Sequence, residues 1–600
     1  MKPWSRLQNI YYMNRYAERI EHLRAFMRAR DLDAVVIYNA DPHLSEYPAL
    51  RWKQVEWLTG FTGEAGDVVV TMDEAYLWTD SRYFIQAESQ LDGTGIKLQK
   101  ARIPGSVSVD EWLLASQGEG ARVGVDSFCT SVENYKSLIA RFDVVCIPDM
   151  LTPLWEDRPG IAQTPIYSIN PGESVEEKLD WLMETLSEKE CDYIIISALD
   201  EIAWLLNVRA SDIEYTPVVI SYLLVGRDGV KWFALKDEIE DDKTFATIEL
   251  LTSKGIRCLP YNEVSIEISS LEDALIWVDR QTLNIEIFSA IKCKKYFAPS
   301  PIQTRKAIKN PVEIDNMRET HLRDGVAMEN FLHWLENKVN DGSRVSEWDA
   351  ALKLAEFRRQ IDDYVENSFE TISAYGAGAA LPHYHTPSQN APLLMPSGMY
   401  LNDSGGQFLR GTTDITRTIP LGVCTELEKR DYTLVLKAHI DLASSVFPSG
   451  IPGCRLDAVA REALWKYRVD FGHGTGHGVG YFLGVHEGPA QIRQNLSGAG
   501  LFSGMIISIE PGVYREGMFG VRHENLYLIA DAGESEFGHF LKFEPLTMCH
   551  FDTSILNLSL LDEWEIEWLD NYNRRVYESI GTFLDEPVRS WLREKTKPVK

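Results

Sequence analysis

The sequence predicts an α/β protein in which two related α/β domains are followed by a larger α+β unit. Three observations favour this fold class. At 600 residues the chain is too long to fold around one hydrophobic core. A helix followed by a buried strand occurs twice, with strands opening at Asp33 and Asp192. Beyond residue 306, glycine-rich turns alternate with short apolar runs, which is typical of a mixed sheet.

The first α/β domain is predicted to begin with an amphipathic helix over residues 13–30. Apolar side chains recur there at steps of three and four, at Tyr16, Ile20, Leu23 and Met27. The apolar run that opens at Asp33 then indicates a buried strand.

The second α/β domain repeats this order. Ser174 and Glu177 have the spacing of a capping box, which predicts the start of a helix. An apolar stripe follows at Val175, Leu179, Leu182 and Leu186, and the helix leads into the strand from Asp192. The repetition predicts two related domains, residues 1–158 and 159–305, with independent convergence on the same pattern as the alternative.

The third domain, residues 306–550, is predicted to open with a long helix. Asn310 is a helix cap, Pro311 suits the first helical position, and Glu313 lies in the first turn. The helix continues to about Val339. A helical tail, residues 551–600, would cap this domain or form a subunit contact.

Composition narrows the class of partner. The net charge of −29 argues against nucleic acid and anionic membranes, because both attract basic surfaces. Eight single cysteines give no CxxC pair and suit a reducing compartment. The N-terminal stretch has no apolar core of signal-peptide length, and the apolar run 218–225 is far too short to span a membrane. We therefore expect a cytoplasmic protein.

Histidines concentrate in the third domain, where seven of the 13 lie between residues 383 and 523. In the segment 471–480, five glycines alternate around His473 and His477. Glycines allow close backbone approach, and packing alone does not need so many. His486 follows at the edge of a flexible stretch, where a histidine is more often functional than buried core.

Four carboxylates accompany these histidines. Asp403 and Asp414 end two predicted strands joined through a glycine-containing turn, and a hairpin could bring them together. The alternative is a turn aspartate and a solvated strand residue. Glu510 ends an apolar strand before a turn. Glu524 shares a strand face with leucines and is predicted to point inward, where it needs a partner: Arg522 or a metal ion.

Together these residues carry a resemblance. The set Asp403, Asp414, His477, Glu510 and Glu524 resembles the five-ligand dinuclear site of the pita-bread metallopeptidases. The phrases DSGGQF, GTTDITRT, HGTGHGVG, VHEGP, EPGVY and VRHEN are most similar to the aminopeptidase P branch. The resemblance covers essentially the whole chain. It implies two creatinase-like N-terminal domains, a pita-bread catalytic domain and a C-terminal extension.

The resemblance implies two divalent metal ions, whose charge would offset the repulsion among four converging carboxylates. Asp403 would hold one ion, His477 and Glu510 the other, with Asp414 and Glu524 bridging both. Oxygen-rich ligation suits Mn²⁺, while Zn²⁺, Co²⁺ and iron stay open. A hydroxide bridging the ions would attack the peptide carbonyl.

Further roles follow from the same resemblance. Glu510 would also carry a proton toward the leaving nitrogen, and His486 would stabilise the developing oxyanion. His383 and His473 would contact the substrate, and Arg522 would orient the carboxylates. The implied substrates are peptides with proline at the second position, from which the N-terminal residue is removed. Proline specificity rests on the resemblance only.

Several alternatives and departures accompany this prediction. A prolidase-type dipeptidase would share all five ligands but carry one N-terminal domain, and a creatinase-like hydrolase would lack the ligands. A binding protein of the histone-chaperone kind would have lost them too. We expect a homodimer. Departures from the family pattern at Asn402, Arg410, Pro420 and His523 remove no ligand but bear on carboxylate orientation and metal preference.

Overall fold

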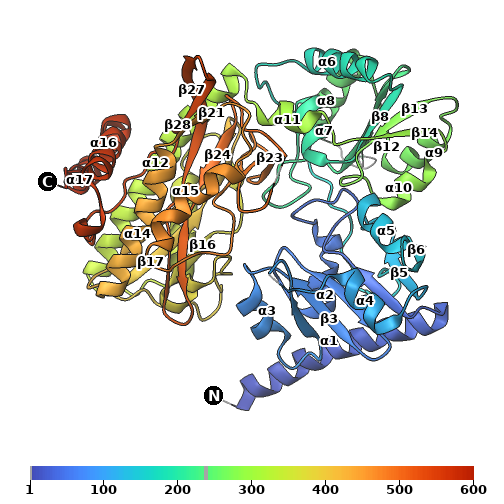
Figure 1. Ribbon diagram of the computed structural model, residues 1–600, viewed down its shortest axis with the longest axis horizontal. Coiled ribbons are helices and arrows are strands. Elements are labelled where there is room, and N and C mark those ends of the chain that lie inside the picture. The colour runs from blue at the N-terminus through green and yellow to red at the C-terminus, as the bar shows by residue number, and fades with distance from the viewer. Residues whose placement is uncertain (1–2, 104, 235–240, 497, 600) are drawn as a thin grey trace. The chain divides into compact units, whose positions relative to one another are not determined.

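The structure, a computed structural model, describes residues 3–103, 105–234, 241–496 and 498–599 (Figure 1). The chain forms two compact units. The first comprises residues 1–170, 174–214 and 218–302. The second comprises residues 303–600 together with the short segments 171–173 and 215–217. The first unit contains both predicted α/β domains, and the second contains all the predicted site residues.

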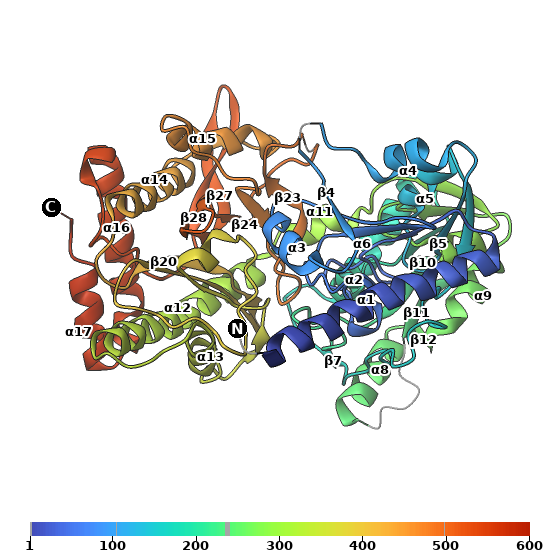
Figure 2. The ribbon, with the colours of Figure 1, turned by 90° about the horizontal axis from the view of Figure 1, so that it is seen from below.

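The first α/β domain is a six-stranded sheet with strand order β4-β3-β2-β1-β5-β6. Its elements are α1 (Pro3–Arg30), β1 (Ala34–Ile37), α2 (Gln54–Thr59), β2 (Asp67–Thr71), β3 (Ala75–Thr79), α3 (Phe84–Leu91), β4 (Lys97–Lys100), α4 (Val109–Gln117), β5 (Arg122–Asp126), α5 (Val132–Ile139) and β6 (Asp143–Ile147). Helix α1 packs on α2 and β2 and runs along the domain (Figure 2). The predicted stripe is confirmed at Ile20, Leu23 and Met27, which are buried.

The second α/β domain has the equivalent strand order, β12-β11-β10-β8-β13-β14. Its elements are β7 (Tyr167–Ser168), α6 (Val175–Glu188), β8 (Tyr193–Ile196), α7 (Leu199–Leu206), β9 (Val208–Arg209), β10 (Ser221–Gly226), β11 (Gly229–Ala234), α8 (Asp242–Ser253), β12 (Ile256–Pro260), α9 (Val264–Ser269), β13 (Leu275–Val278), α10 (Ile285–Ala290) and β14 (Lys294–Phe297). In each sheet the central strand pairs antiparallel on one side and parallel on the other. The predicted relationship between the two domains is therefore confirmed in their topology.

The two α/β domains contact each other at several places, one of which is a buried turn of the first domain. The Pro42 carbonyl accepts hydrogen bonds from Asn284 Nδ2 at 2.6 Å and from the Tyr222 hydroxyl at 3.3 Å. The neighbouring His43 ring places Nδ1 2.9 Å from the Ser197 carbonyl. Because these groups are buried, their hydrogen bonds form a buried polar contact between the two domains of the first unit.

The second unit begins with α11 (Ile302–Ala307) and the long helix α12 (Pro311–Asn340), which starts at the predicted Asn310–Glu313 capping box. The helices that follow are α13 (Glu347–Arg358), α14 (Glu426–Ala443), α15 (Cys454–Trp465), α16 (Glu563–Ile580) and α17 (Glu586–Lys595). The strands are β15 (Tyr364–Asn367), β16 (Ile372–Tyr375), β17 (Met399–Ser404), β18 (Gly406–Phe408), β19 (Gly411–Thr412), β20 (Ile415–Pro420), β21 (Val446–Pro448), β22 (Gly476–Gly478), β23 (Glu487–Ile492), β24 (Ile506–Ile509), β25 (Gly512–Arg515), β26 (Phe519–Arg522), β27 (Asn525–Ser535) and β28 (Gly538–Pro545).

Three small sheets and one larger sheet organise the described strands around the site. The larger sheet has the order β21-β28-β27-β24-β22-β23, and β17 lies between β16 and β20 in a small one. The helical tail packs on α12 and α14 through buried residues such as Ile440, Leu569 and Val576 (Figure 1). The tail thus caps this unit, the first of the two predicted alternatives. No helix in the described parts of the chain has the length and hydropathy to cross a bilayer.

The predicted hairpin from Tyr400 to Thr418 is confirmed, because β17 with β20 and β18 with β19 pair in one antiparallel register, from Met399↔Pro420 to Phe408↔Gly411. The prediction for the strand that carries Glu524 is wrong in detail. The run from Gly520 to Ile529 is not one strand, because the chain leaves β26 after Arg522 and enters β27 at Asn525. These two strands belong to different sheets, so Arg522 and Glu524 do not lie on one face of a single strand.

Candidate active site

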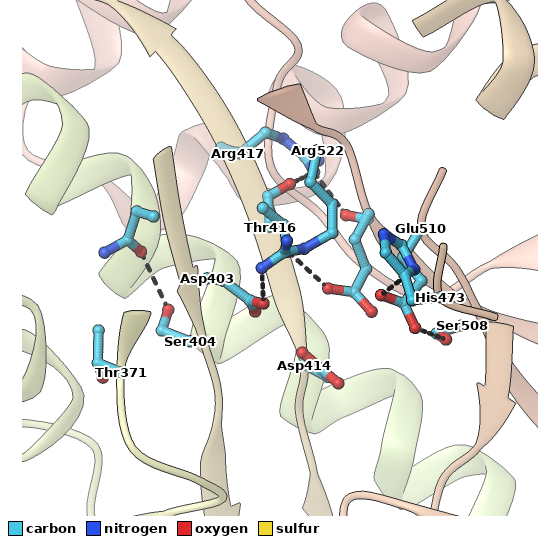
Figure 3. A network of polar contacts seen from close by, with 12 residues as sticks. Thr371, Asp403, Ser404, Asp414, Thr416, Arg417, His473, Ser508, Glu510 and Arg522 are labelled. Carbon is cyan, nitrogen blue, oxygen red and sulfur yellow. Dashed lines mark hydrogen bonds and ion pairs between the residues drawn. The ribbon is translucent and has the colours of Figure 1, made fainter. Parts of the chain in front are cut away.

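The strand pair β17–β20 positions the two aspartates. It places Asp403 opposite Thr416, and Asp414 immediately precedes β20 (Figure 3). At Gly405 the two arms of the hairpin approach so closely that an added Cβ would lie 2.0 Å from the Thr413 carbonyl oxygen. Only glycine fits there, and the hairpin brings both carboxylates to face the same space.

His477 is held between two glycines for a similar reason. A Cβ on Gly476 would lie 1.9 Å from the Ser508 carbonyl oxygen, and one on Gly478 would lie 2.2 Å from that of Glu487. The close approach presents the His477 ring from β22. Its Nδ1 lies 3.0 Å from the Gly478 carbonyl, which can only accept, so Nδ1 carries a hydrogen, and in the neutral ring Nε2 carries the lone pair.

That lone pair faces carboxylates. His477 Nε2 lies 3.4 Å from Asp414 Oδ2 and 3.5 Å from Glu510 Oε1. Glu510 follows β24, where its backbone N–H donates to the Thr475 carbonyl at 2.8 Å. Because this nitrogen and both carboxylates can only accept in these forms, a proton or a metal cation must lie between them.

Glu524 completes the set from the break between β26 and β27. Its Oε2 accepts a hydrogen bond from Thr416 Oγ1 at 2.8 Å. Ligand atoms of Asp414, His477 and Glu524 all lie within 4.8 Å of one another. The structure therefore brings together the five residues predicted to bind metal.

Several buried carboxyl groups lie close together in the site, and this shifts their pKa values. Burial raises the pKa of Asp403, of Glu510 and, most strongly, of Glu524, and the neighbouring carboxylates raise each further. Without cations, these raised pKa values favour the uptake of protons by the cluster.

Two buried oxygens indicate where cations fit. Asp403 Oδ1 and Glu524 Oε1 are enclosed, and neither has a hydrogen-bond partner in the described structure. Buried acceptors are normally satisfied, so the two oxygens and the His477 lone pair are consistent with a divalent-metal site. The donor set of carboxylates and one imidazole fits two such ions.

A second buried group, Glu329, Cys549 and His550, has a different character. The Glu329 carboxylate already accepts hydrogen bonds from the backbone N–H of His550 at 2.8 Å and from its Nδ1 at 2.8 Å. Burial raises the pKa of the Cys549 thiol well above its usual value, which disfavours the thiolate that binds metals. In this cluster the histidine and the carboxylate are joined by hydrogen bonds within the fold.

Arg522 is the buried cation of the site, but its partner is not Glu524. Its Nη2 donates to Asp403 Oδ2 at 2.5 Å, and its Nε donates to Thr416 Oγ1 at 3.1 Å (Figure 3). The carboxylate that Arg522 contacts is therefore that of Asp403. The carboxylate of Glu524 accepts a hydrogen bond from the Thr416 hydroxyl instead.

Three further residues were not predicted. The Tyr514 hydroxyl accepts from Arg522 Nη1 at 2.7 Å and lies 2.8 Å from His473 Nε2. Thr416 connects Glu524 with Arg522, and the Ser508 hydroxyl accepts from the His477 backbone N–H at 3.0 Å. The signal for Thr416 is its spacing of two residues from Asp414, which puts both side chains on one face of an extended segment.

His473 and His486 lie beside the ligands. The His473 ring is neutral, because burial and then Arg522 lower its pKa well below the usual value. Its Nδ1 lies 2.7 Å from the Gly474 carbonyl and its Nε2 faces Tyr514, so both nitrogens are engaged within the protein. The His486 ring packs edge-on against His477 with centroids 4.4 Å apart. His383 is partly buried, and it adds to the lowering of the His473 pKa.

A buried ion triad anchors the strand that follows His486. The Glu487 carboxylate forms an ion pair with Lys306 at 2.6 Å and a second with Lys309. All three side chains are almost completely buried, with at most 2% of any side chain exposed. These ion pairs link the start of the second unit, at Lys306 and Lys309, to the segment that carries His486.

Nearly the whole length of the chain is similar to known protein families. Residues 315–531, which include all five candidate ligands, match the model of metallopeptidase family M24. Residues 19–156 and 157–313 each match a creatinase/prolidase N-terminal domain, and residues 539–599 match the C-terminal region of the M24 peptidases. Xaa-Pro aminopeptidase app-1 of Caenorhabditis elegans is 38% identical and aligns over 96% of this chain and 97% of its own. The chain belongs to metallopeptidase family M24, in its aminopeptidase P group.

Two further relatives of this M24 chain agree. A probable Xaa-Pro aminopeptidase P of Laccaria bicolor is 37% identical over 97% of the chain and 93% of the relative. The crystal structure of the X-prolyl aminopeptidase of C. elegans, described as a cytosolic enzyme with a di-nuclear active site, has a TM-score of 0.91. It is 38% identical and covers 95% of both chains. The predicted fold class, two creatinase-type domains before an M24 domain, is thus confirmed.

The departures of this M24 chain have local explanations at two positions. Asn402 points away from the site and is fully buried, where its Nδ2 donates to the Tyr400 hydroxyl at 3.1 Å and its Oδ1 accepts from Ser404 Oγ at 3.1 Å. The polar side chain is therefore satisfied within its own strand face. Arg410 pairs at the surface with Glu319 of α12 at 3.0 Å.

The other two departures are Pro420 and His523. Pro420 ends β20 opposite Met399. His523 is fully buried, and burial lowers its pKa well below the usual value. Its ring packs edge-on against Tyr432 with centroids 4.5 Å apart. The neutral imidazole thus fills the space of an aliphatic residue beside Glu524.

Proposed function

We propose that the chain is an Xaa-Pro aminopeptidase that hydrolyses the bond between an N-terminal residue and proline with two bound divalent metal ions. The single observation that carries the proposal is the convergence of His477 Nε2 on Asp414 and Glu510 beside the buried, unpartnered oxygens of Asp403 and Glu524. Such a donor set binds cations, and the names of the chain's relatives point to this substrate class.

Each ligand has a proposed place. Asp403 would hold one ion, His477 and Glu510 the other, and Asp414 and Glu524 both. When bound, two such ions supply the Lewis acidity that activates water and polarises a peptide carbonyl. Asp403 is kept in position by Arg522, and Glu524 by Thr416.

The remaining roles belong to side chains around the ligands. Glu510, whose pKa is raised by burial, would carry a proton to the prolyl nitrogen as it leaves. His486 would donate a hydrogen bond to the carbonyl oxygen as negative charge develops there. His383 would contact the substrate. His473 would line the site with its ring, since both of its nitrogens already hydrogen-bond within the protein.

Finer properties are part of the proposal. Four carboxylates with one imidazole favour Mn²⁺ over softer ions, with Zn²⁺ and Co²⁺ as alternatives. We place the domains at residues 1–158, 159–305, 306–550 and 551–600. We also propose a cytoplasmic homodimer, in keeping with the description of the C. elegans enzyme as cytosolic and with the low cysteine content.

The test is a matched peptide series on Mn²⁺-reconstituted protein: Arg-Pro-Pro, Arg-Ala-Ala, Gly-Pro and N-acetylated Arg-Pro-Pro. We expect arginine release from Arg-Pro-Pro alone, lost on chelation and in Asp414→Asn. Preference for Gly-Pro would instead indicate a prolidase-type dipeptidase. Metal binding without cleavage of any peptide would favour a binding protein on the same fold.

A further inference from the structure

Glu347, the first residue of α13, is an unusual buried carboxylate. It is completely enclosed, and its Oε1 accepts from the Tyr375 backbone N–H at 2.7 Å. Its Oε2 accepts from the Tyr384 hydroxyl at 2.8 Å. Over the described ranges, no lysine, arginine or histidine forms an ion pair with it. A buried carboxylate without a cation is costly, so its position calls for an explanation.

Tyr384 connects Glu347 to the candidate active site, because it directly follows His383 in the chain. Two residues further on, the Thr386 hydroxyl accepts the backbone N–H of Ser373 in β16 at 2.9 Å. The segment that carries His383 is therefore fixed at Tyr384 by a side chain and at Thr386 by the sheet.

The fold leaves room for this pair. A Cβ on Gly378 would lie 3.1 Å from the Tyr384 ring and 3.4 Å from Glu347 Oε1, so a larger residue there would press on both. His383 in turn lies close enough to His473 to help lower its pKa, after burial and Arg522. The chain of contacts thus runs from a buried carboxylate to a histidine beside the metal ligands.

We propose that Glu347 and Tyr384 are positioning residues that hold His383 against the substrate. The inference rests on the proposed function, which assigns His383 a substrate contact. The hydroxyl of Tyr384 fixes the ring and, through the shared backbone, the direction in which the neighbouring imidazole leaves the chain. Misplacing a contact by about 1 Å is enough to cost a large part of the rate.

The protonation of Glu347 should control this contact. The titratable groups that face it are the phenols of Tyr384 and Tyr400, whose pKa values it helps to raise. Burial raises the pKa of Glu347 to about 7. Above that pH the carboxylate accepts from both donors. As the pH falls through about 7 it takes up a proton and loses one acceptor site, so kcat/KM should decrease.

The experiment measures Tyr384→Phe, Glu347→Gln and the double variant that carries both of these changes. Each is compared with Glu370→Gln. Glu370 is the matched control, because it binds His385 of the same segment at 2.9 Å but is exposed. We would measure kcat and KM for Arg-Pro-Pro from about pH 5.5 to 9, the bound metal and the melting temperature, with His383→Ala as reference.

We expect kcat/KM at about pH 8 to fall about tenfold in each single variant and no further in the double variant, as for residues that act as a unit. Bound metal should stay unchanged, and the step near pH 7 should vanish in Glu347→Gln, which is neutral at every pH. Glu370→Gln should behave as wild type.

Wild-type kinetics and an unchanged pH profile in Tyr384→Phe, with His383→Ala impaired, would overturn the inference and leave the proposed function standing. Tyr384→Phe removes one oxygen atom only, so it decides the question even where Glu347→Gln does not fold. A wild-type protein that cleaves no peptide of the series would overturn both.

Discussion

The buried triad of Lys306, Glu487 and Lys309 permits a quantitative prediction about stability. The change is Glu487→Gln, which keeps the side-chain volume and removes the charge that two enclosed ammonium groups share. Removing one partner of a buried ion pair costs about 3–5 kcal/mol, because the remaining charge stays desolvated.

The magnitude converts into a melting temperature. Unfolding of about 300 residues has an entropy of roughly 0.6 kcal/mol per kelvin, so the transition of the second unit should fall by about 5–8 °C. If both units unfold together, the entropy doubles and the shift is about half as large. Lys306→Met is the matched comparison, because Lys309 and Glu487 then remain as a balanced pair. Its loss should be clearly smaller.

Differential scanning calorimetry of the full chain measures both variants, with circular dichroism at low temperature as the check that they fold. A Glu487→Gln shift below about 1 °C, or losses that are equal in the two variants, would refute the reasoning, since 1 °C corresponds to about 0.6 kcal/mol for the second unit alone and about 1.3 kcal/mol if both units unfold together.

Three other perturbations have defined outcomes. Gly476→Ala should reduce metal affinity and activity together, because its Cβ would lie 1.9 Å from the Ser508 carbonyl oxygen, whereas Gly498→Ala, with open space around it, should change neither. Equal metal titrations of these two variants would contradict this. Tyr514→Phe removes the hydroxyl shared by Arg522 and His473 and should lower kcat/KM about tenfold with little change in melting temperature; unaltered kinetics would count against it. Because burial raises the pKa of Asp403, Glu510 and Glu524, metal binding should release protons and tighten as the pH rises. Calorimetric heats that do not depend on the buffer would disprove that.

Much of the architecture could be predicted from local patterns. Capping boxes at Ser174 and Asn310 begin α6 and α12 as expected, because they satisfy backbone groups within one turn. The five candidate ligands were predicted from short motifs whose glycines have a steric cause in the fold, as Gly405 and Gly476 illustrate.

Contacts between distant residues escaped prediction. Tyr384 lies 37 residues beyond Glu347, and no periodicity connects them. Arg522 was one of two candidate partners of Glu524, the other being a metal ion, and its contact with Asp403 was not foreseen because a period-two pattern assumes a continuous strand, whereas the chain changes sheets between residues 522 and 525. Tertiary placement decides such pairings, and a single sequence does not display it.

The buried polar contact at Pro42 and His43 bears on how the first unit tolerates truncation. Asn284 and Tyr222 lose their shared acceptor in any deletion of the first domain, so such a fragment exposes the buried interface of the second domain to water. Substitutions confined to the turn at Pro42 would leave other hydrogen bonds between the domains in place, such as those from the backbone N–H groups of Val132 to the Leu283 carbonyl and of Ile285 to the Thr130 carbonyl. In the intact chain, the duplicated domains therefore hold each other in place through several hydrogen bonds across their interface.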